Sequence, residues 1–323
     1  MAQASDFRPP LWLRSGMVQT VLASSKRRQA RFSAFEAAGQ RVELNAGPGR
    51  RSTAYLNLHR DQRGLVVLLH GWLGGPGSGY VLSTAQSLHE AGLSVARVTL
   101  PDQGEAALLT REVIDLTRHD VLRTALLDLL GQLEDQPVGL MGFSLGGNFA
   151  FRLARDHAQH PIPNLRHVIG ASAVIEPEDT CTQIDAIGLF RRYFLKKFLR
   201  LSQEKQAVFP DLPGVSDLLG QRTIRAVTEI SVRHYTRFPS LDAYFEGYRI
   251  GRCDLAGAAV PVTLLTALDD PIVRPQYAQG LTDGPGFERI FTRHGGHNGF
   301  YTRFPAQVFS DHLAVDRFTR DLR

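Results

Sequence analysis

Residues 137–154 read PVGLMGFSLGGNFAFRLA, a run that begins as a strand and continues as a helix. The apolar residues before Ser144 are typical of a short buried strand, and those after Gly147 follow a helical pattern. Ser144 stands at the turn between the two, within the motif Gly-x-Ser-x-Gly. Because Gly142 and Gly146 have no side chain, they leave room for the strand and the helix to approach a strained serine.

This strand–serine–helix arrangement is typical of the nucleophile elbow of α/β-hydrolases, which exposes a serine side chain at the top of the sheet. The helix that begins at Leu145 would point free N–H groups, and the positive end of its dipole, toward an oxyanion at Ser144. The motif alone also arises by chance in a chain with 30 glycines. Its position between a strand and a helix argues against coincidence.

The rest of the chain alternates between apolar strand-like runs and helical patterns. We expect strands at 65–69, 93–100, 167–174, 261–268 and 287–291, and helices at 81–91, 113–133 and 306–322. Two further strand-like runs, 40–44 and 53–58, flank the turn signal at residues 47–49 and predict an opening antiparallel hairpin. The alternation predicts the α/β class: an α/β-hydrolase fold with a doubly wound, mostly parallel sheet.

The alternation stops between residues 176 and 257, which contain helical patterns and no clear strand. We interpret 176–257 as a helical cap inserted over the carboxyl edge of the sheet, where ligands enter open α/β folds. The hydrolase core would then comprise residues 1–175 and 258–323. Within it, residues 1–35 form an N-terminal arm, in which Pro9 and Pro10 exclude an early helix and later apolar residues suggest packing on the main body.

One predicted cap helix has two distinct faces. Three aromatic residues recur at helical spacing on one face: Phe190, Phe194 and Phe198. Three basic residues recur on another face: Arg192, Lys196 and Arg200. The simpler interpretation is an apolar face packed on the protein and a solvated basic face. The alternative is contact with an acyl chain or a membrane surface.

Charge and cysteine content exclude several classes of function. The net charge of +5 comes from scattered arginine rather than a basic tail, so it does not indicate nucleic-acid binding. A short basic run at 26–31 is interpreted as a solvated loop rather than an anion site. Cys181 and Cys253 are too few for a disulfide framework or a cysteine zinc site.

With no signal peptide or membrane span in residues 1–32, we expect a cytoplasmic protein with reduced thiols. The sequence does not indicate the oligomeric state.

Three candidate catalytic residues follow strands in the order serine, aspartate, histidine, which is the order that this fold uses. They are Ser144, Asp270 after the strand at 261–268, and His297 after the strand at 287–291. Parallel strands end at one edge of a sheet, so the three side chains should converge there. Ser144 would attack as the nucleophile, His297 would take its proton, and Asp270 would orient the imidazole.

Neighbouring residues compete for two of these roles. Asp269 is the alternative to Asp270, which is favoured because it directly precedes a Pro-Ile-Val turn. His294 is the alternative to His297, which the family pattern given below favours.

The expected oxyanion donors are the backbone N–H groups of Leu145 and of Trp72, which follows the strand at 65–69. His70, at the start of the same loop, is interpreted as a structural residue that braces it, because one histidine suffices as the base.

Motifs spanning residues 9 to 300 resemble the YheT-type branch of the α/β-hydrolases (AB hydrolase superfamily 4, with eukaryotic ABHD1-like and ABHD3-like relatives). They are PPLWL at 9–13 with Gly16, Gln19 and Thr20, HGW at 70–72, GFSLGGN at 142–148, DDP at 269–271 and GGHNGF at 295–300. The resemblance implies a carboxylic-ester hydrolase, with some relatives acting as acyltransferases or phospholipases. The sequence departs from the branch at two places. Met17 stands where the branch often has histidine, and PDQG at 101–104 replaces a motif that usually carries arginine or histidine. These departures put the substrate preference in question.

The sequence therefore predicts a serine esterase (a carboxylesterase) that works through an acyl-enzyme, with a small ester or an acyl lipid as substrate and no metal or organic cofactor. Acyl transfer, thioester cleavage and lipid-directed (phospho)lipase activity use the same residues and are alternatives. A hydrolase-fold binding protein without catalysis is the alternative from another class. We expect no nucleic-acid partner, and a peripheral membrane contact through the cap is an open alternative.

Overall fold

The structure is a computed structural model that describes residues 3–4, 7–60, 63–113 and 115–322; the other residues, all in the predicted core domain, lie outside the described part of the chain. Its main strands are β1 (Gln3–Ala4), β2 (Gln40–Asn45), β3 (Arg51–Asn57), β4 (Leu65–Leu69), β5 (Ser94–Val98), β6 (Val138–Phe143), β7 (Leu165–Ala171), β8 (Val262–Ala267) and β9 (Phe287–Thr292). They form one sheet in the order β1-β9-β8-β7-β6-β4-β5-β3-β2. Among these described strands, the pairs β2–β3 and β3–β5 are antiparallel and the other neighbours are parallel. The predicted fold class is confirmed.

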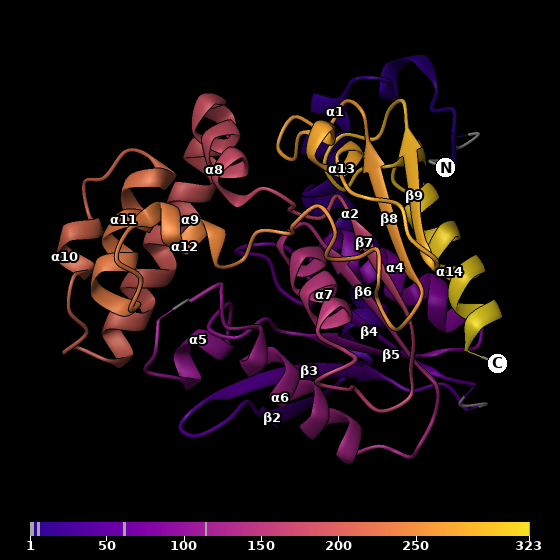
Figure 1. The fold of residues 1–323 in the computed structure, drawn as a ribbon, viewed down its shortest axis with the longest axis horizontal. Coiled ribbons are helices and arrows are strands. Elements are labelled where there is room, and N and C mark those ends of the chain that lie inside the picture. Colours follow the sequence, from indigo (N-terminus) through magenta and orange to yellow (C-terminus); the bar gives the residue numbers. More distant parts are fainter. Residues whose placement is uncertain (1–2, 5–6, 61–62, 114, 323) are drawn as a thin grey trace.

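Helices cover both faces of this sheet (Figure 1). The helices outside residues 176–257 are α1 (Gly16–Ala23), α2 (Lys26–Arg31), α3 (Ser33–Ala37), α4 (Gly79–Glu90), α5 (Ala106–Leu109), α6 (His119–Gly131), α7 (Leu145–Arg155), α13 (Pro275–Gln279) and α14 (Phe309–Asp321), with a 3-10 turn η1 (Leu11–Leu13) before α1. Side chains of α6 and α7 share one apolar cluster with the sheet, and side chains of α4 and α14 share another. The sheet is therefore the middle of three layers.

β4 shows why a continuous apolar run predicts a central strand. Successive side chains of a strand point to opposite faces. Leu65, Val67 and Leu69 accordingly join the cluster with α6 and α7, whereas Val66 and Leu68 join the cluster with α4 and α14. All five are at most 2% exposed, and burying each contributes about 1.5–3 kcal/mol to stability. A strand with water on one face would instead alternate apolar and polar residues.

The helix predicted over 113–133 begins only at His119, and residue 114 lies outside the described residues. The carbonyls of Leu116 and Thr117 accept hydrogen bonds from the Arg152 guanidinium at 2.7 and 2.9 Å. Because each of these carbonyls already accepts a hydrogen bond from a buried guanidinium, it does not need the i+4 amide donor that a helix would provide. The apolar spacing before residue 119 therefore belongs to a loop.

The basic run at 26–31 is not a solvated loop. It forms α2, and Arg28 within it is fully buried. The Arg28 guanidinium carbon lies 4.9 Å from the centre of the Tyr301 ring, and Nη1 donates to Asn298 O at 3.5 Å. Stacking on an aromatic ring lets a guanidinium act as an internal packing group, which the charge pattern alone does not indicate. The last helix also begins later than predicted, because the hairpin β10 (Tyr301–Arg303) and β11 (Gln307–Val308) precedes it.

Between β7 and β8 the chain forms a group of helices at one side of the sheet (Figure 1). They are α8 (Pro177–Ala186), α9 (Gly188–Val208), α10 (Val215–Leu218), α11 (Ile224–Tyr235) and α12 (Leu241–Glu246). The two faces of α9 are as predicted: Phe190 and Phe198 are buried, whereas the three basic residues 192, 196 and 200 are exposed. The division into a core and a cap, with boundaries at 176 and 257, stays our prediction. No helix among the described residues has the length and apolar composition that crossing a membrane requires.

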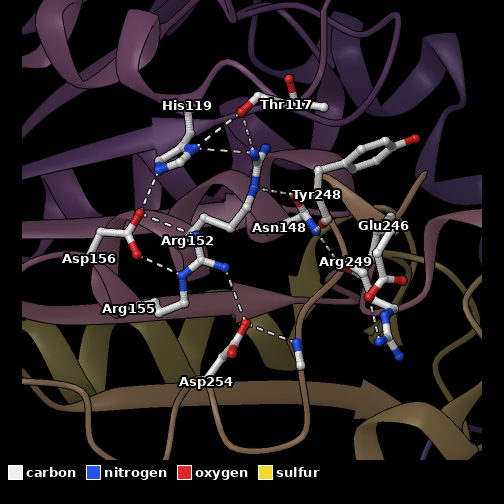
Figure 2. Close-up of polar contacts among 12 residues, drawn as sticks. Thr117, His119, Asn148, Arg152, Arg155, Asp156, Glu246, Tyr248, Arg249 and Asp254 are labelled. Carbon is white, nitrogen blue, oxygen red and sulfur yellow. Dashed lines mark hydrogen bonds and ion pairs between the residues drawn. The ribbon is translucent and has the colours of Figure 1, made fainter. Parts of the chain in front are cut away.

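A buried polar network fastens the helix after the serine to this region. Asn148, in the first turn of α7, donates from Nδ2 to Val174 O at 2.9 Å and to Tyr248 O at 2.7 Å. Its Oδ1 accepts from Arg152 Nε at 2.9 Å, and Figure 2 shows Arg152 between Asn148 and Thr117. Burial lowers the pKa of Arg152 to about 9. The guanidinium is therefore still charged at neutral pH, and each hydrogen bond to it is charge-assisted.

Candidate active site

Ser144 occupies a strained turn between β6 and α7. Its backbone angles are φ 55° and ψ −116°, a conformation that costs a non-glycine residue about 1–3 kcal/mol. A Cβ at Gly142 would lie 2.1 Å from Gly146 O, and a Cβ at Gly146 would lie 2.5 Å from His70 O and Leu69 O. Both distances are shorter than any side chain tolerates. The predicted role of the two glycines, which is to admit strand and helix to the serine, is confirmed.

His297 and Asp270 form a hydrogen-bonded pair. His297 Nδ1 and Asp270 Oδ2 are 2.9 Å apart, and the Asp270 side chain is fully enclosed. The other oxygen, Oδ1, accepts from the N–H groups of Ile272 at 2.8 Å and Val273 at 2.9 Å. A carboxylate that accepts backbone N–H groups on one oxygen is left with the second oxygen for the imidazole. The Pro-Ile-Val turn is thus the device that orients Asp270.

The neighbouring Asp269 faces another way. Its Oδ1 accepts from Gly296 N at 2.8 Å, and its Oδ2 lies 3.7 Å from His294 Nδ1, which is beyond hydrogen-bonding distance. Burial raises the pKa of Asp269. The geometry therefore pairs Asp270, and not Asp269, with His297.

The N-terminal arm holds the histidine loop. The His297 N–H donates to Thr20 Oγ1 at 2.8 Å, and the Thr20 hydroxyl donates to Gly16 O at 2.6 Å. Gln19 accepts a hydrogen bond from Tyr301 N at 2.8 Å and donates one to Leu13 O at 2.8 Å. The resemblance singled out these arm residues without giving them a role. Their role here is to fasten the loop that carries His297.

Two amide N–H groups next to Ser144 are available to an anion. In the described part of the chain, the N–H groups of Trp72 and Leu145 donate to no protein acceptor. Their neighbours are used: Leu73 N donates to Gln103 Oε1 at 2.8 Å, and Ser144 N donates to β7 at 2.9 Å. Gln103 was missed as a site residue, although the departure at 101–104 pointed to its loop. It holds the segment that presents the Trp72 amide.

His70 is a structural residue, as predicted. It is fully buried, its Nε2 accepts from Leu100 N at 3.0 Å, and its Nδ1 lies 2.8 Å from Gly71 O. This pattern requires a neutral ring with the proton on Nδ1. Burial lowers the pKa of His70 to about 4. The imidazole braces the loop that leads to Trp72.

Ser144 and His297 line one cavity of about 750 Å³. Its walls are largely apolar and come from the core and the helices of residues 176–257, with Leu116, Val174, Ile184, Phe190, Phe245 and Ile272 among them. A cavity of this size and composition suits a small or medium-sized organic ligand. In the described residues, no hydrogen bond joins the Ser144 hydroxyl to the His297 imidazole. Such contacts often form only when substrate is bound.

The sheet and the strand-end residues around Ser144 define the α/β-hydrolase class. The chain belongs to the alpha/beta hydrolase family, whose family model matches residues 66–311.

Individual relatives are distant. Human protein ABHD15 is 31% identical over 161 residues, which cover 47% of this chain and 34% of that protein, so the chain spans about a third of its length. Mouse alpha/beta hydrolase domain-containing protein 10 is 15% identical with a TM-score of 0.53, over 87% of this chain and 97% of that chain. The Pyrococcus furiosus esterase Pf2001 is 13% identical with a TM-score of 0.59, over 88% and 93%. At these identities the two structures are alike in fold.

The buried state of His70 predicts a pH-dependent loss of stability. Because its pKa is lower in the folded protein than in the unfolded chain, the unfolded chain binds the proton first as the pH falls. His70 should therefore contribute fully above pH 6.5, and its contribution should fall by about 3 kcal/mol between pH 6.5 and about 4. Urea unfolding of the wild type and of His70→Gln across this range measures the difference. Equal pH slopes in the two proteins would contradict a neutral, buried His70.

Proposed function

We propose that this protein is a serine esterase that hydrolyses carboxylic esters through an acyl-enzyme. One observation carries the proposal: His297, fixed by the buried Asp270, lines the same cavity as a serine on a strained strand-to-helix turn. A serine hydroxyl is a weak nucleophile unless a neighbouring base removes its proton. The His297–Asp270 pair supplies that base within a cavity that can enclose an ester.

In the proposed reaction, Ser144 Oγ forms a bond to the ester carbonyl carbon while His297 Nε2 takes the hydroxyl proton. The tetrahedral intermediate collapses, the bond to the alcohol oxygen breaks, and His297 returns the proton to the leaving alcohol. Water then attacks the acyl-enzyme by the same steps and releases the acid. Asp270 keeps the proton of the resting imidazole on Nδ1 and stabilises the imidazolium. The reaction calls for no metal or organic cofactor.

The N–H groups of Trp72 and Leu145 would bind the negative charge that develops on the carbonyl oxygen. Preorganised donors of this kind stabilise an oxyanion by about 3 kcal/mol each. The Leu145 amide is also at the start of α7, where the positive end of the helix dipole favours negative charge. The adjacent N–H groups, those of Ser144 and Leu73, already donate to protein acceptors. The N–H groups of Leu145 and Trp72 are therefore the ones that remain for the oxyanion.

We further propose that the chain belongs to the YheT-type branch of the family. The arm motif supports this, because Thr20 and Gln19 accept from the N–H groups of His297 and Tyr301, and the Thr20 hydroxyl donates to Gly16 O.

An acyl lipid is a second candidate substrate, with the protein bound peripherally to a membrane. Leu189 and Tyr193 line the cavity and are 52% and 43% exposed, and the basic face of α9 adjoins them. Charge reversal at Arg192, Lys196 and Arg200 should reduce binding to vesicles of anionic phospholipid at least tenfold in a sedimentation assay, because each lost basic residue removes about 1 kcal/mol. Unchanged vesicle binding would remove the membrane proposal and leave the esterase proposal standing.

A fluorophosphonate probe should label Ser144 covalently, because the probe reacts with an activated serine and leaves a stable phosphonyl ester. Ser144→Ala should abolish both labelling and turnover of p-nitrophenyl esters. Intact-mass and peptide mass spectrometry identify the labelled residue. Absence of labelling in folded wild-type protein would contradict the proposal.

The two adjacent aspartates provide a matched pair of variants. Asp270→Asn should lower kcat about 10⁴-fold, since an amide at this position favours the wrong imidazole tautomer. Asp269→Asn should lower kcat less than tenfold, because the amide oxygen can still accept the Gly296 N–H and the imidazole of His297 pairs with Asp270 instead. Steady-state kinetics with one p-nitrophenyl ester compares them directly. A larger loss in Asp269→Asn than in Asp270→Asn would reverse the assignment.

A further inference from the structure

We propose that Lys197 binds an anionic group of the substrate, so that the cavity selects esters that carry a negative charge beside the ester bond. This inference rests on the proposed esterase function and names its substrate class. It comes from one side chain that the proposed reaction does not use.

Lys197 belongs to the face of α9 that lines the cavity. The lining residues of this helix are Leu189, Phe190, Tyr193, Phe194 and Lys197, which recur with helical spacing. Among the described lining residues, Lys197 is the one lysine, and the lining contains no arginine, aspartate or glutamate. A permanent charge is therefore placed in a cavity that is otherwise apolar or neutral.

The ammonium of Lys197 has no acidic partner. Its Nζ lies 3.3 Å from Tyr193 Oη and 5.1 Å from the centre of the Tyr193 ring. In the described residues, no carboxylate lies within 4 Å of it, whereas Arg200 and Lys205 of the same helix pair with Glu204 and Asp102. The contact between Lys197 and Tyr193 is exposed to solvent, so the ammonium is accessible, and no acidic side chain competes with an anionic ligand for it.

Lys197 also lies near the oxyanion loop. The rings of Trp72 and Phe194 stack with centres 5.6 Å apart and planes at 17°, so α9 packs directly on this loop. Burial chiefly lowers the pKa of His70 at the start of the loop, and the charge of Lys197 lowers it further. Lys197 follows Phe194 by three residues on α9, which places it on the helix face that meets the Trp72 loop. An anionic group there would lie close to the ester that Ser144 attacks.

The recognised chemistry is a carboxylate or a phosphate, and it has two sources: the acid part or the alcohol part of the ester. Two matched pairs of substrates separate them. For the acid part, mono-p-nitrophenyl adipate is compared with its neutral methyl ester. For the alcohol part, the hexanoyl ester of glycerol 3-phosphate is compared with hexanoyl glycerol, with acid release followed by titration.

The measured quantity is the ratio of kcat/KM for the anionic ester to that for its neutral match. In one of the two pairs, Lys197→Met should lower this ratio about 10- to 100-fold, chiefly through KM, because a hydrogen-bonded charge contact is lost. Lys197→Arg should restore most of the ratio. Lys26→Met, at an exposed position outside the cavity lining, should leave both the ratio and the activity unchanged.

An unaltered ratio in Lys197→Met for both pairs would overturn the inference, as would an equal loss on charged and neutral esters. Failure of every ester to react would contradict the esterase function instead. In that case, calorimetric binding of both matched pairs of esters to Ser144→Ala still tests Lys197. Equal affinity for the charged and the neutral ester in both pairs, with or without Lys197→Met, would then overturn the inference.

Discussion

The close approach of β6, α7 and the end of β4 is the constraint on which the rest of this structure depends. Any Cβ at position 142 or 146 would overlap a backbone carbonyl, so these segments meet only through glycine. The chain turns so sharply there that Ser144 adopts a conformation with positive φ. A strained residue persists only where its surroundings over-determine it. Here the buried sheet on one side and the Asn148 network on the other provide that support.

The other parts of the site reach Ser144 through long-range contacts of different kinds. Asp270 depends on a local turn, because its partners Ile272 and Val273 follow it directly. His297 depends on the far end of the sequence, since its N–H is held by Thr20. The rim of the cavity comes from α9, whose aromatic face packs on Trp72. The carboxyl edge of the sheet, the N-terminal segment with α1 and the helices of residues 176–257 thus each contribute part of the wall of one cavity.

Local patterns predicted the sheet, the turn at Ser144 and the choice of Asp270, because each is encoded by residues close to a strand end. The choice of His297 over His294 came from the family resemblance instead. Contacts between distant residues left no such pattern. Gln103 holds a residue 30 positions earlier, and Thr20 holds one 277 positions later. The loop before α6 was predicted to be helical because its apolar residues recur at helical spacing, yet its carbonyls accept hydrogen bonds from Arg152. Periodicity describes one element at a time, whereas these outcomes depend on which elements meet.

The central claim is that a serine on this strained turn generates an oxyanion between two backbone amides. A crystal structure of the protein after reaction with a phosphonate ester inhibitor tests it most directly. The account predicts phosphorus bonded to Ser144 Oγ, with the phosphoryl oxygen about 2.7–3.1 Å from the nitrogen atoms of both Trp72 and Leu145. A phosphoryl oxygen turned away from both amides, or phosphorus bonded to another residue, would contradict it.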